Sequence, residues 1–399
     1  MTFDRDQFLE DGFLIVREAI PPDELEAVRS AYEVLVDRQR KVWARDRKPS
    51  DPPGGLWDSA AQPRLNLGAM ASLIDEHSAK AVETWLFPEI HSLSSALLDV
   101  PDAAGTEMML MCNPVRDHGP ARWHRDMYPP LCAPIRGYID EILGSGPRYV
   151  QWNITLYYDD TLWVVPGSHK RINTPEEDAQ ILEDPHAPVP GGIQTRLKAG
   201  DGVVYILPIL HWGSNYSTKR RRCIHGGFSM FSQYEDLSYL DFLSEEAQAA
   251  FQRWDRRSED MKDQTEAALR TFMNGDIAGY FAALDRLHPG RGEKGQVLST
   301  VFLSKTARRI DQIKRPGNDR LSEQEQGWAT RSHPMTLQWG TAFADRFTTQ
   351  GAALLWKRFK PVDAMVRSDD MQFAPSFQGA DWYYHFIDMP ASENILEII

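Results

Sequence analysis

The sequence predicts an α+β protein in which an antiparallel β-sandwich or barrel is flanked by helices. Short β-prone runs recur between turn signals in the middle of the chain, at residues 108–112, 149–157, 162–165, 202–209 and 223–231. Helical patterns precede these runs and return after residue 235. Closely spaced short runs are typical of antiparallel sheets, whereas strands alternating with helices would indicate a parallel sheet.

The segments on either side of the β-rich region predict helices. Residues 13–16 form a short apolar run, and Pro21-Pro22 can open a helix that extends to about residue 40, because proline is well placed in a first helical turn. Ser244 is typical of an N-cap. Apolar side chains then recur at helical spacing over residues 245–272, 277–287, 296–313 and 337–359.

We therefore expect two domains. Residues 1–235 would form the β-rich domain with its N-terminal supporting helices. Residues 236–399 would form a mainly helical extension that packs on this core and serves as a lid or as the interface of a homodimer. The aromatic cluster at residues 382–386 is more typical of a core or an interface, and a lid is the alternative interpretation.

Composition excludes several classes of protein. The 399 residues are 42% hydrophobic, which excludes an intrinsically disordered chain. The net charge of −13 argues against nucleic-acid binding, and no apolar run approaches the length of a membrane span. Three cysteines without metal-type spacing and an N-terminus without a secretory signal predict a cytoplasmic protein in a reducing compartment.

One histidine–carboxylate motif stands out. His124 and Asp126 have the spacing of residues that project from the same face of an extended segment, so both could bind one metal ion. A second histidine would complete a facial triad, and His211 is the best candidate because it ends a buried apolar run. Ten residues later, Arg221 could direct its guanidinium into the same barrel and bind a dicarboxylate through two hydrogen bonds.

Several segments together resemble the phytanoyl-CoA dioxygenase family of Fe(II)/2-oxoglutarate-dependent oxygenases. They occur in the family's order and cover about residues 5–231. The matching segments are DGFLIV at 11–16, WHRD at 123–126, VPGSHK at 165–170, GDGVV at 200–204, HWGSN at 211–215 and STKRR at 217–221. The resemblance implies a double-stranded β-helix, also called a jelly roll or cupin-like fold, as the core.

The resemblance also implies roles for individual residues. His124, Asp126 and His211 would hold Fe(II), with O2 as the oxidant. Arg221 would bind the distal carboxylate of the co-substrate 2-oxoglutarate, and Arg222 remains the alternative because the loop after His211 is one residue shorter than usual. The other candidates for the co-substrate site are the polar face of residues 149–157 and the turn before the arginine, namely Gln151, Asn153, Thr155 and Ser217.

Four further residues are candidates for the substrate pocket. Arg125, Tyr128 and Trp212 flank the proposed ligands in sequence, and His225 lies on the strand after Arg221. A single buried histidine is more often a hydrogen-bonded core residue than a ligand, so each candidate depends on the whole motif set. His169 is more typical of a structural residue that closes a turn.

The activity implied by the resemblance is hydroxylation of an unactivated C–H bond in a small-molecule metabolite. Asp126 argues against a halogenase, since a halide would need the coordination position of the carboxylate. Two alternatives stay open. One is a metal-dependent isomerase or lyase on the same fold, and the other is a non-catalytic scaffold whose helical part binds a partner.

Overall fold

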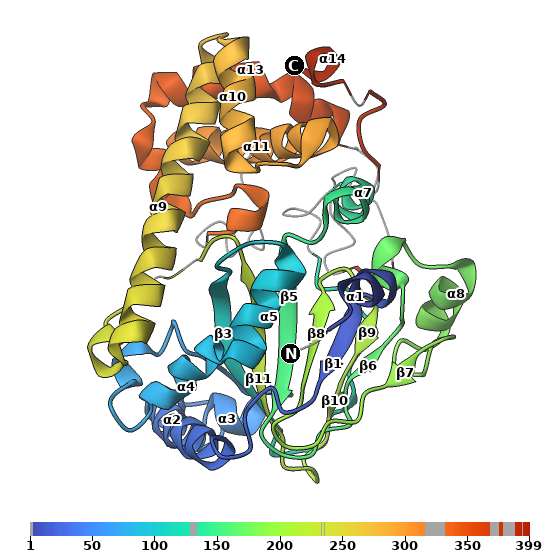
Figure 1. Cartoon of the computed structure of the whole chain (residues 1–399), viewed down its shortest axis with the longest axis vertical. Helices are drawn as coiled ribbons and strands as arrows, with labels where there is room; N and C mark the ends of the chain where they lie inside the picture. The colour runs from blue at the N-terminus through green and yellow to red at the C-terminus, as the bar shows by residue number, and fades with distance from the viewer. Residues whose placement is uncertain are drawn as a thin grey trace. The chain divides into compact units, whose positions relative to one another are not determined.

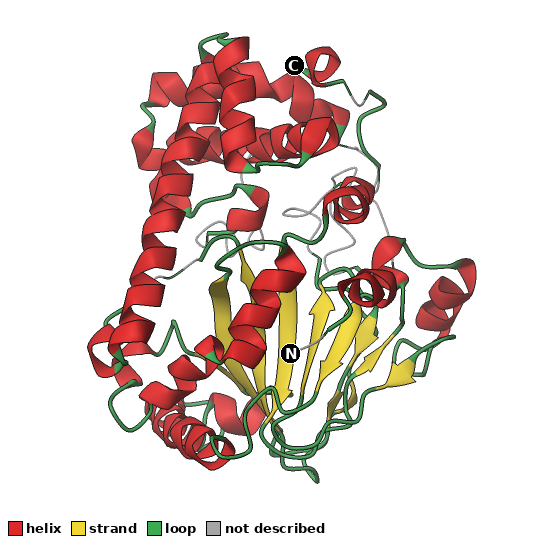
Figure 2. Ribbon diagram, in the orientation of Figure 1, coloured by secondary structure: helices red, strands yellow, loops and turns green. Residues whose placement is uncertain are grey.

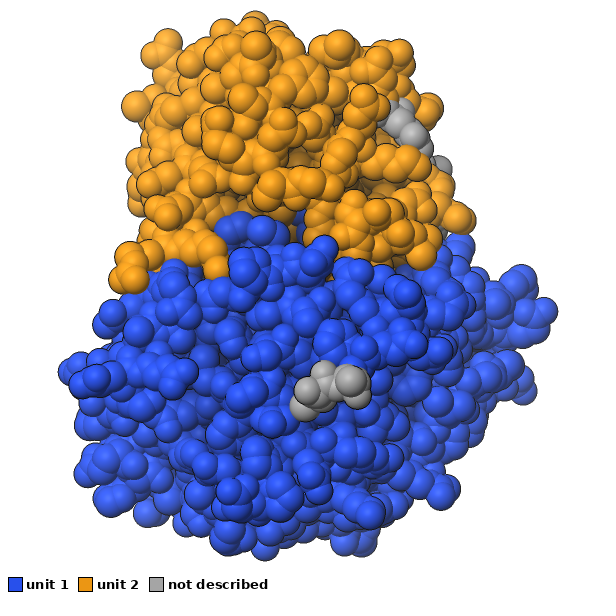
Figure 3. Space-filling model, viewed as in Figure 1, with its two compact units in different colours: residues 1–125, 148–255 blue, residues 126–147, 256–399 orange. Residues whose placement is uncertain are grey.

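The computed structural model describes residues 3–127, 134–232, 234, 236–315, 332–367, 375–377, 388–392 and 394–399 (Figure 1). Their packing divides the chain into two compact units (Figure 3). The first unit contains residues 1–125 and 148–255, and the second contains residues 126–147 and 256–399. The division into domains 1–235 and 236–399 stays a prediction.

The first unit is built on a six-stranded antiparallel sheet with the strand order β1-β8-β5-β11-β3-β2. A three-stranded sheet, β7-β6-β9, and the pair β10-β4 complete its strands. The bounds are β1 Phe13–Val16, β2 Arg64–Asn66, β3 Ala104–Cys112, β4 Gly119–Pro120, β5 Tyr149–Thr155, β6 Trp163–Val164, β7 Ile193–Gln194, β8 Gly202–Ile206, β9 His211–Trp212, β10 Ser214–Asn215 and β11 Arg222–Ser229.

The two larger sheets enclose a common apolar core. Val203 and Tyr205 of β8 pack against Val164 of β6, together with Ile209. The opposite face of the main sheet is covered by the helix α5, Pro88–Leu98 (Figure 2). Trp152 of β5 donates its indole N–H to the Ser94 hydroxyl of this helix. Antiparallel sheets packed in this way, with helices on the outside, form an α+β jelly roll, so the predicted fold class is confirmed.

The remaining helices of the first unit lie around the sheets, and local caps fix the ends of two of them. Asp4 caps α1 by accepting from the Gln7 N–H, and Gly12 ends α1 in the left-handed conformation, with φ of +82°. At α8, Thr174 and Glu177 form a capping box. The bounds are α1 Arg5–Asp11, α2 Leu25–Arg45, α3 Leu56–Ser59, α4 Ala79–Glu83, α8 Pro175–Glu183 and the 3-10 turns η1 Ala71–Leu73, η2 Thr84–Leu86, η3 Ser168–Lys170 and η4 Leu240–Phe242.

The second unit is helical and is organised around α11 (Gly292–Lys314), whose side chains are buried almost continuously from Val297 to Ile310. A helix buried on all sides must be surrounded by others, and α11 packs against α7, α10, α13 and α14. The bounds are α7 Ile135–Ser145, α9 Glu245–Met273, which begins in the first unit, α10 Ile277–Leu287, η5 Pro334–Thr336, η6 Thr341–Arg346, α13 Thr349–Met365 and α14 Ile395–Ile398.

The helices predicted after residue 235 agree with α9, α10 and α11, but the expectation of one helix over residues 337–359 was wrong. The chain forms η6 instead and begins a new helix, α13, at Thr349. The reason is local, since the Thr348 side chain accepts from the Gly351 N–H and caps the new helix. Among the described residues, no helix has both the length and the apolar character required to span a membrane.

Candidate metal centre

His124 and His211 face each other across a short antiparallel bridge. The backbone N–H of each donates to the carbonyl oxygen of the other, at 3.0 Å in both directions. His211 begins β9 after the apolar strand β8, and His124 lies in the extended stretch that follows β4. Residues paired directly across two strands project to the same face, and the two imidazole centroids are 4.3 Å apart.

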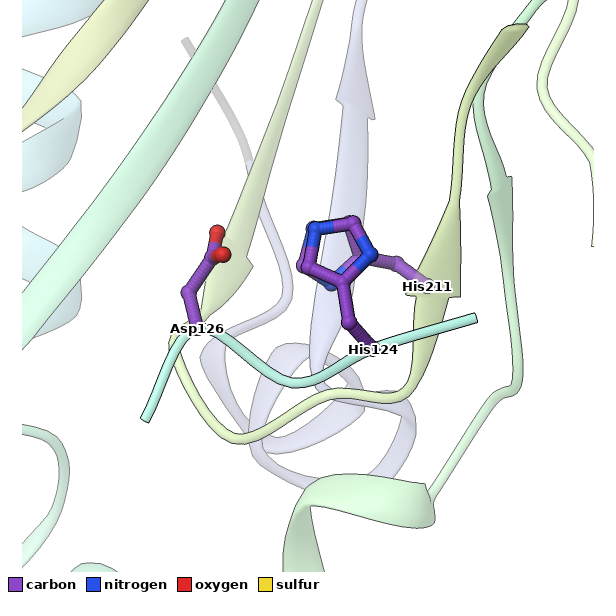
Figure 4. Close-up of side chains that lie close together, drawn as sticks. All are labelled: His124, Asp126 and His211. Carbon is purple, nitrogen blue, oxygen red and sulfur yellow. The ribbon is translucent and has the colours of Figure 1, made fainter. Parts of the chain in front are cut away.

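Asp126 completes the cluster (Figure 4). One ligand atom from each of His124, Asp126 and His211 lies within 4.8 Å of the other two. Within the described ranges, no other group of three histidine, cysteine or acidic side chains has this arrangement. Asp126 is counted with the second unit, but a single residue separates it from His124, so local chain geometry sets its place beside the histidines.

The hydrogen bonds of both imidazoles select the tautomer that a metal requires. Nδ1 of His124 lies 2.7 Å from the Arg122 carbonyl oxygen, and Nδ1 of His211 lies 3.0 Å from that of Ile209. A carbonyl oxygen can only accept, so each Nδ1 carries a proton, and in the neutral imidazole Nε2 carries the lone pair. Two neutral imidazoles and one carboxylate are the donor set typical of non-haem Fe(II) oxygenases, so these residues fit an iron ion.

The polar face of β5 is turned toward the interior of the sandwich, as the sequence predicts. Gln151 and Asn153 are almost fully buried. The Gln151 amide donates to the Tyr205 hydroxyl at 2.7 Å, and Asn153 Oδ1 lies 2.6 Å from Nδ1 of His225. The Tyr205 ring centroid is 5.4 Å from that of His211, so this polar face begins next to a histidine of the candidate metal cluster.

Arg221 and Arg222 project to opposite sides of the main sheet. The pleat places Arg221 on the face of His225, which pairs with Asn153, and Arg222 on the other. Arg222 pairs there with Glu33 of α2, at 3.1 Å. The Arg221 side chain is only 7% exposed, and its Nε donates to Asp159 Oδ2 at 2.7 Å. Only Arg221 therefore shares the interior face with the polar residues of β5.

The ion pair between Arg221 and Asp159 keeps both groups charged inside the protein. Burial opposes both charges, because it raises the pKa of the Asp159 carboxyl and lowers that of the Arg221 guanidinium. Their mutual attraction outweighs burial, so the pKa of Asp159 lies below its ordinary value and that of Arg221 lies above. Thr161 adds two hydrogen bonds to Asp159 Oδ1, from its backbone N–H at 2.8 Å and from its hydroxyl at 2.7 Å.

The structure gives Arg125 a supporting position instead of a place in a pocket. Its side chain is fully buried. The guanidinium donates to the carbonyl oxygens of Ser168 and Pro208, at 2.7 and 2.5 Å, and to Asn173 Oδ1 through two nitrogens. Arg125 thus ties the stretch that carries His124 and Asp126 to the turn before His211.

Trp212 and Ser217 likewise have structural surroundings. Trp212 is buried in an aromatic cluster, with ring centroids 5.2 Å from Trp123 and 5.6 Å from Trp163. Ser217 lies in the connection between β10 and β11, where its N–H and hydroxyl both donate to Asp117. These contacts tie Trp212 into the aromatic cluster and Ser217 into the turn before Arg221, and the roles expected from sequence for both residues stay predictions.

Thr155 and Tyr128 are the remaining site residues that the sequence predicts. Thr155 lies on the interior face of β5, and its hydroxyl donates to the Tyr157 carbonyl oxygen. Tyr128 and the aromatic cluster at 382–386 lie outside the described residues. Sequence reasoning missed Tyr205 and Asp159, both of which contact predicted site residues. The signal for Tyr205 was its place in an apolar strand pairing with β5, and Asp159 had none beyond its acidic character.

Comparison with known proteins agrees with this geometry. The sequence profile of the family Phytanoyl-CoA dioxygenase (PhyH) matches residues 8–223. No curated protein sequence gave a significant match.

Solved structures that match this chain share low sequence identity with it. AviO1 from Streptomyces viridochromogenes Tue57 is 22% identical, with 57% of this chain and 96% of that chain covered and a TM-score of 0.40. The non-heme alpha ketoglutarate dependent epimerase SnoN from nogalamycin biosynthesis is 15% identical, with 56% and 79% covered and a TM-score of 0.38. EctD from S. alaskensis, solved with 2-oxoglutarate and 5-hydroxyectoine, is 15% identical, with 56% and 74% covered and a TM-score of 0.39.

The family profile spans more than half of the chain and includes all three residues of the metal-binding cluster. The fold is the expected jelly roll, and the donor set fits iron. The chain therefore belongs to the phytanoyl-CoA dioxygenase family and is a non-haem iron, 2-oxoglutarate-dependent oxygenase.

Proposed function

We propose that this oxygenase hydroxylates an unactivated C–H bond of a small-molecule metabolite. In this reaction, substrate, O2 and 2-oxoglutarate give hydroxylated product, succinate and CO2. The observation that carries the proposal is the pairing of a two-histidine, one-carboxylate cluster with a buried arginine on the interior face of the same sandwich. Iron held at this cluster supplies the oxygen-activating chemistry, and the chain's own residues bind and orient the reactants.

His124, Asp126 and His211 are the proposed iron ligands. The carbonyl oxygens of Arg122 and Ile209 hold the two imidazoles in the ligating tautomer, which removes the need for rearrangement when the metal binds. A metal ion held by these three side chains would remain able to bind the co-substrate and O2. The Asp126 carboxylate would bind the iron where a halogenase would need a halide, which favours oxygen insertion over halogenation.

Arg221 is the proposed clamp for the distal carboxylate of 2-oxoglutarate. Its Nε is engaged by Asp159, so the two terminal nitrogens form the edge that a carboxylate can meet with two hydrogen bonds. Gln151, Asn153 and Thr155 line the interior face of the adjacent strand and are the proposed neighbours of the co-substrate, and His225 is proposed to contact the co-substrate or the substrate.

The proposal is tested first by anaerobic titration of Fe(II) and 2-oxoglutarate, followed by visible absorption. We expect a weak charge-transfer band near about 500 nm, typical of a 2-oxo acid chelated to ferrous iron, and its loss in His211→Ala. No band with iron bound would favour a metal-dependent isomerase or lyase. No iron binding at all would favour a non-catalytic scaffold.

Hydroxylation itself requires a second measurement. Candidate metabolites incubated with Fe(II), 2-oxoglutarate and ¹⁸O2 should yield a product that carries one labelled oxygen, with one succinate formed per product. A product that has lost two hydrogens and gained no oxygen would replace hydroxylation by desaturation or ring closure.

The cytoplasmic location is supported by Cys112 and Cys223, which are buried free thiols, and a homodimer stays a prediction.

A further inference from the structure

The carboxylate of Asp159 is buried although Asp159 is neither a proposed iron ligand nor a proposed contact of the co-substrate. It lies in the connection between β5 and β6 and is 5% exposed. Its chain is held in place by the backbone of Leu197, since the N–H of each residue donates to the carbonyl of the other, at 3.0 and 2.9 Å. Its two carboxylate oxygens have different partners, because Oδ1 accepts from Thr161 and Oδ2 accepts from Arg221.

We propose that Asp159 is a positioning residue that holds Arg221 in place, charged and oriented, before the co-substrate arrives. The inference rests on the proposed function of Arg221 as the carboxylate clamp. A buried guanidinium without a counter-ion would be strongly destabilising, since the full cost of removing it from water would remain. Asp159 supplies that counter-ion in the protein without co-substrate.

The geometry of the pair also determines which edge of the guanidinium is used. Asp159 Oδ2 accepts from the Arg221 Nε–H at 2.7 Å, and this hydrogen bond fixes the plane and rotation of the guanidinium. The edge formed by the two terminal nitrogens then has a defined direction. A ligand carboxylate that binds this edge brings a second negative charge to the same arginine. It can therefore replace part of the charge compensation that the Asp159 carboxylate provides. Dicarboxylates should therefore compensate for loss of the Asp159 charge, and monocarboxylates should not.

The variant Asp159→Asn tests this role. The asparagine Oδ1 can still accept from Thr161, but its amide donates and so cannot pair with the Arg221 Nε–H. The neighbouring Asp160→Asn is a matched control, because Asp160 pairs with Lys219 near the surface, at 2.5 Å, and the substitution removes the same charge. Each protein is loaded with Mn(II), which avoids turnover, and its Tm is measured alone and with 2-oxoglutarate, succinate or 2-oxobutyrate.

We expect the Tm of Asp159→Asn to fall by roughly 5–15 °C, as for an unpaired buried charge in a domain of this size, and that of Asp160→Asn by far less. 2-Oxoglutarate and succinate should raise the Tm of Asp159→Asn by several degrees more than that of the wild type. 2-Oxobutyrate, which has the same 2-oxo acid end but no distal carboxylate, should raise both equally. A loss in Tm that dicarboxylates do not preferentially recover would overturn the proposal.

The double variant Asp159→Asn/Arg221→Gln keeps the test decisive if the single variant does not fold. Removing both charges leaves no unpaired ion, so this protein should have a higher Tm than Asp159→Asn and should show no preference for dicarboxylates. A double variant as unstable as the single one would mean that Asp159 holds its own turn and not Arg221. If 2-oxoglutarate fails to stabilise even the wild type, the clamp function of Arg221 is what fails, because the pairing measured by the double variant does not depend on it.

Discussion

Replacing Arg125 with methionine should weaken both the fold and the metal site. Methionine preserves most of the apolar bulk but removes four hydrogen bonds, two of them to the buried carbonyl oxygens of Ser168 and Pro208. Each buried acceptor that loses its donor costs about 1–3 kcal/mol, and the Ser168 carbonyl oxygen keeps the backbone N–H of Arg171, at 3.4 Å. Loss of the desolvation cost of the guanidinium offsets part of this, so we expect the free energy of unfolding to fall by about 3–5 kcal/mol.

The same change should loosen the iron ligands, because Arg125 lies between His124 and Asp126 and its acceptor Pro208 lies three residues before His211. Partners that orient metal ligands typically affect metal affinity by about 10- to 100-fold. We therefore expect Arg125→Met to weaken Fe(II) binding by about this factor.

The assay combines urea unfolding, followed by tryptophan fluorescence, with competition for Fe(II) against a chelator of known affinity. Arg122→Met is the matched control, since Arg122 is exposed in the same stretch and only its backbone carbonyl contacts His124. It should change the free energy of unfolding by no more than about 0.5 kcal/mol. Full iron affinity in Arg125→Met would refute the reasoning, as would a loss of affinity in Arg122→Met of the same size.

Three further predictions follow from side chains of the first unit. Arg221→Gln should weaken 2-oxoglutarate binding by more than about 100-fold, whereas Arg222→Gln should leave the affinity within a few-fold; calorimetric titration with Mn(II) present measures both. Trp212→Ala should lower the free energy of unfolding by about 3–5 kcal/mol in urea, because it empties a packed aromatic cluster. Burial lowers the pKa of His169 from 6.5 to about 4, so the unfolded chain binds the proton first and stability should fall as the pH drops from 6.5 toward 4. The loss should reach at most about 3 kcal/mol, and His169→Gln should show a flatter dependence of unfolding free energy on pH over this range.

The cluster of His124, Asp126 and His211 could be predicted because its signal is local. His124 and Asp126 share a face through the two-residue period of an extended chain, and His211 follows a buried strand. The same period bears on the residues beside them, whose expected places in the substrate pocket stay predictions. Arg125 and Trp212 are immediate neighbours of ligands, so in extended segments their side chains point away from the metal. Proximity in sequence to a ligand therefore argues against a place in the pocket here.

Contacts between distant parts of the chain were beyond sequence reasoning. Asp159 and Arg221 are 62 residues apart, and no local pattern links an acidic residue in a connection to an arginine before a strand. Gly12 and His169 form another such contact, which sequence alone does not reveal. A Cβ at position 12 would lie 2.1 Å from the His169 ring, so only glycine fits there. The helix boundary at Thr348 differs, since its capping pattern was present but was outweighed by the apolar periodicity around it.

The choice between Arg221 and Arg222 shows how a sheet can decide what residue counting cannot. Counting from His211 leaves both arginines open, because the length of the intervening loop varies. Strand pairing does not have this freedom, since a shift of one residue would reverse every side chain of β11. The strand β11 pairs with β5 on one side, where His225 lies opposite Asn153, and with β3 on the other, where Cys223 lies opposite Met111. Both neighbours therefore fix the register of β11. A slip that brought Arg222 inside would also turn His225 away from its hydrogen-bond partner and expel Arg221 from Asp159, so the neighbouring strands together select Arg221 for the interior face.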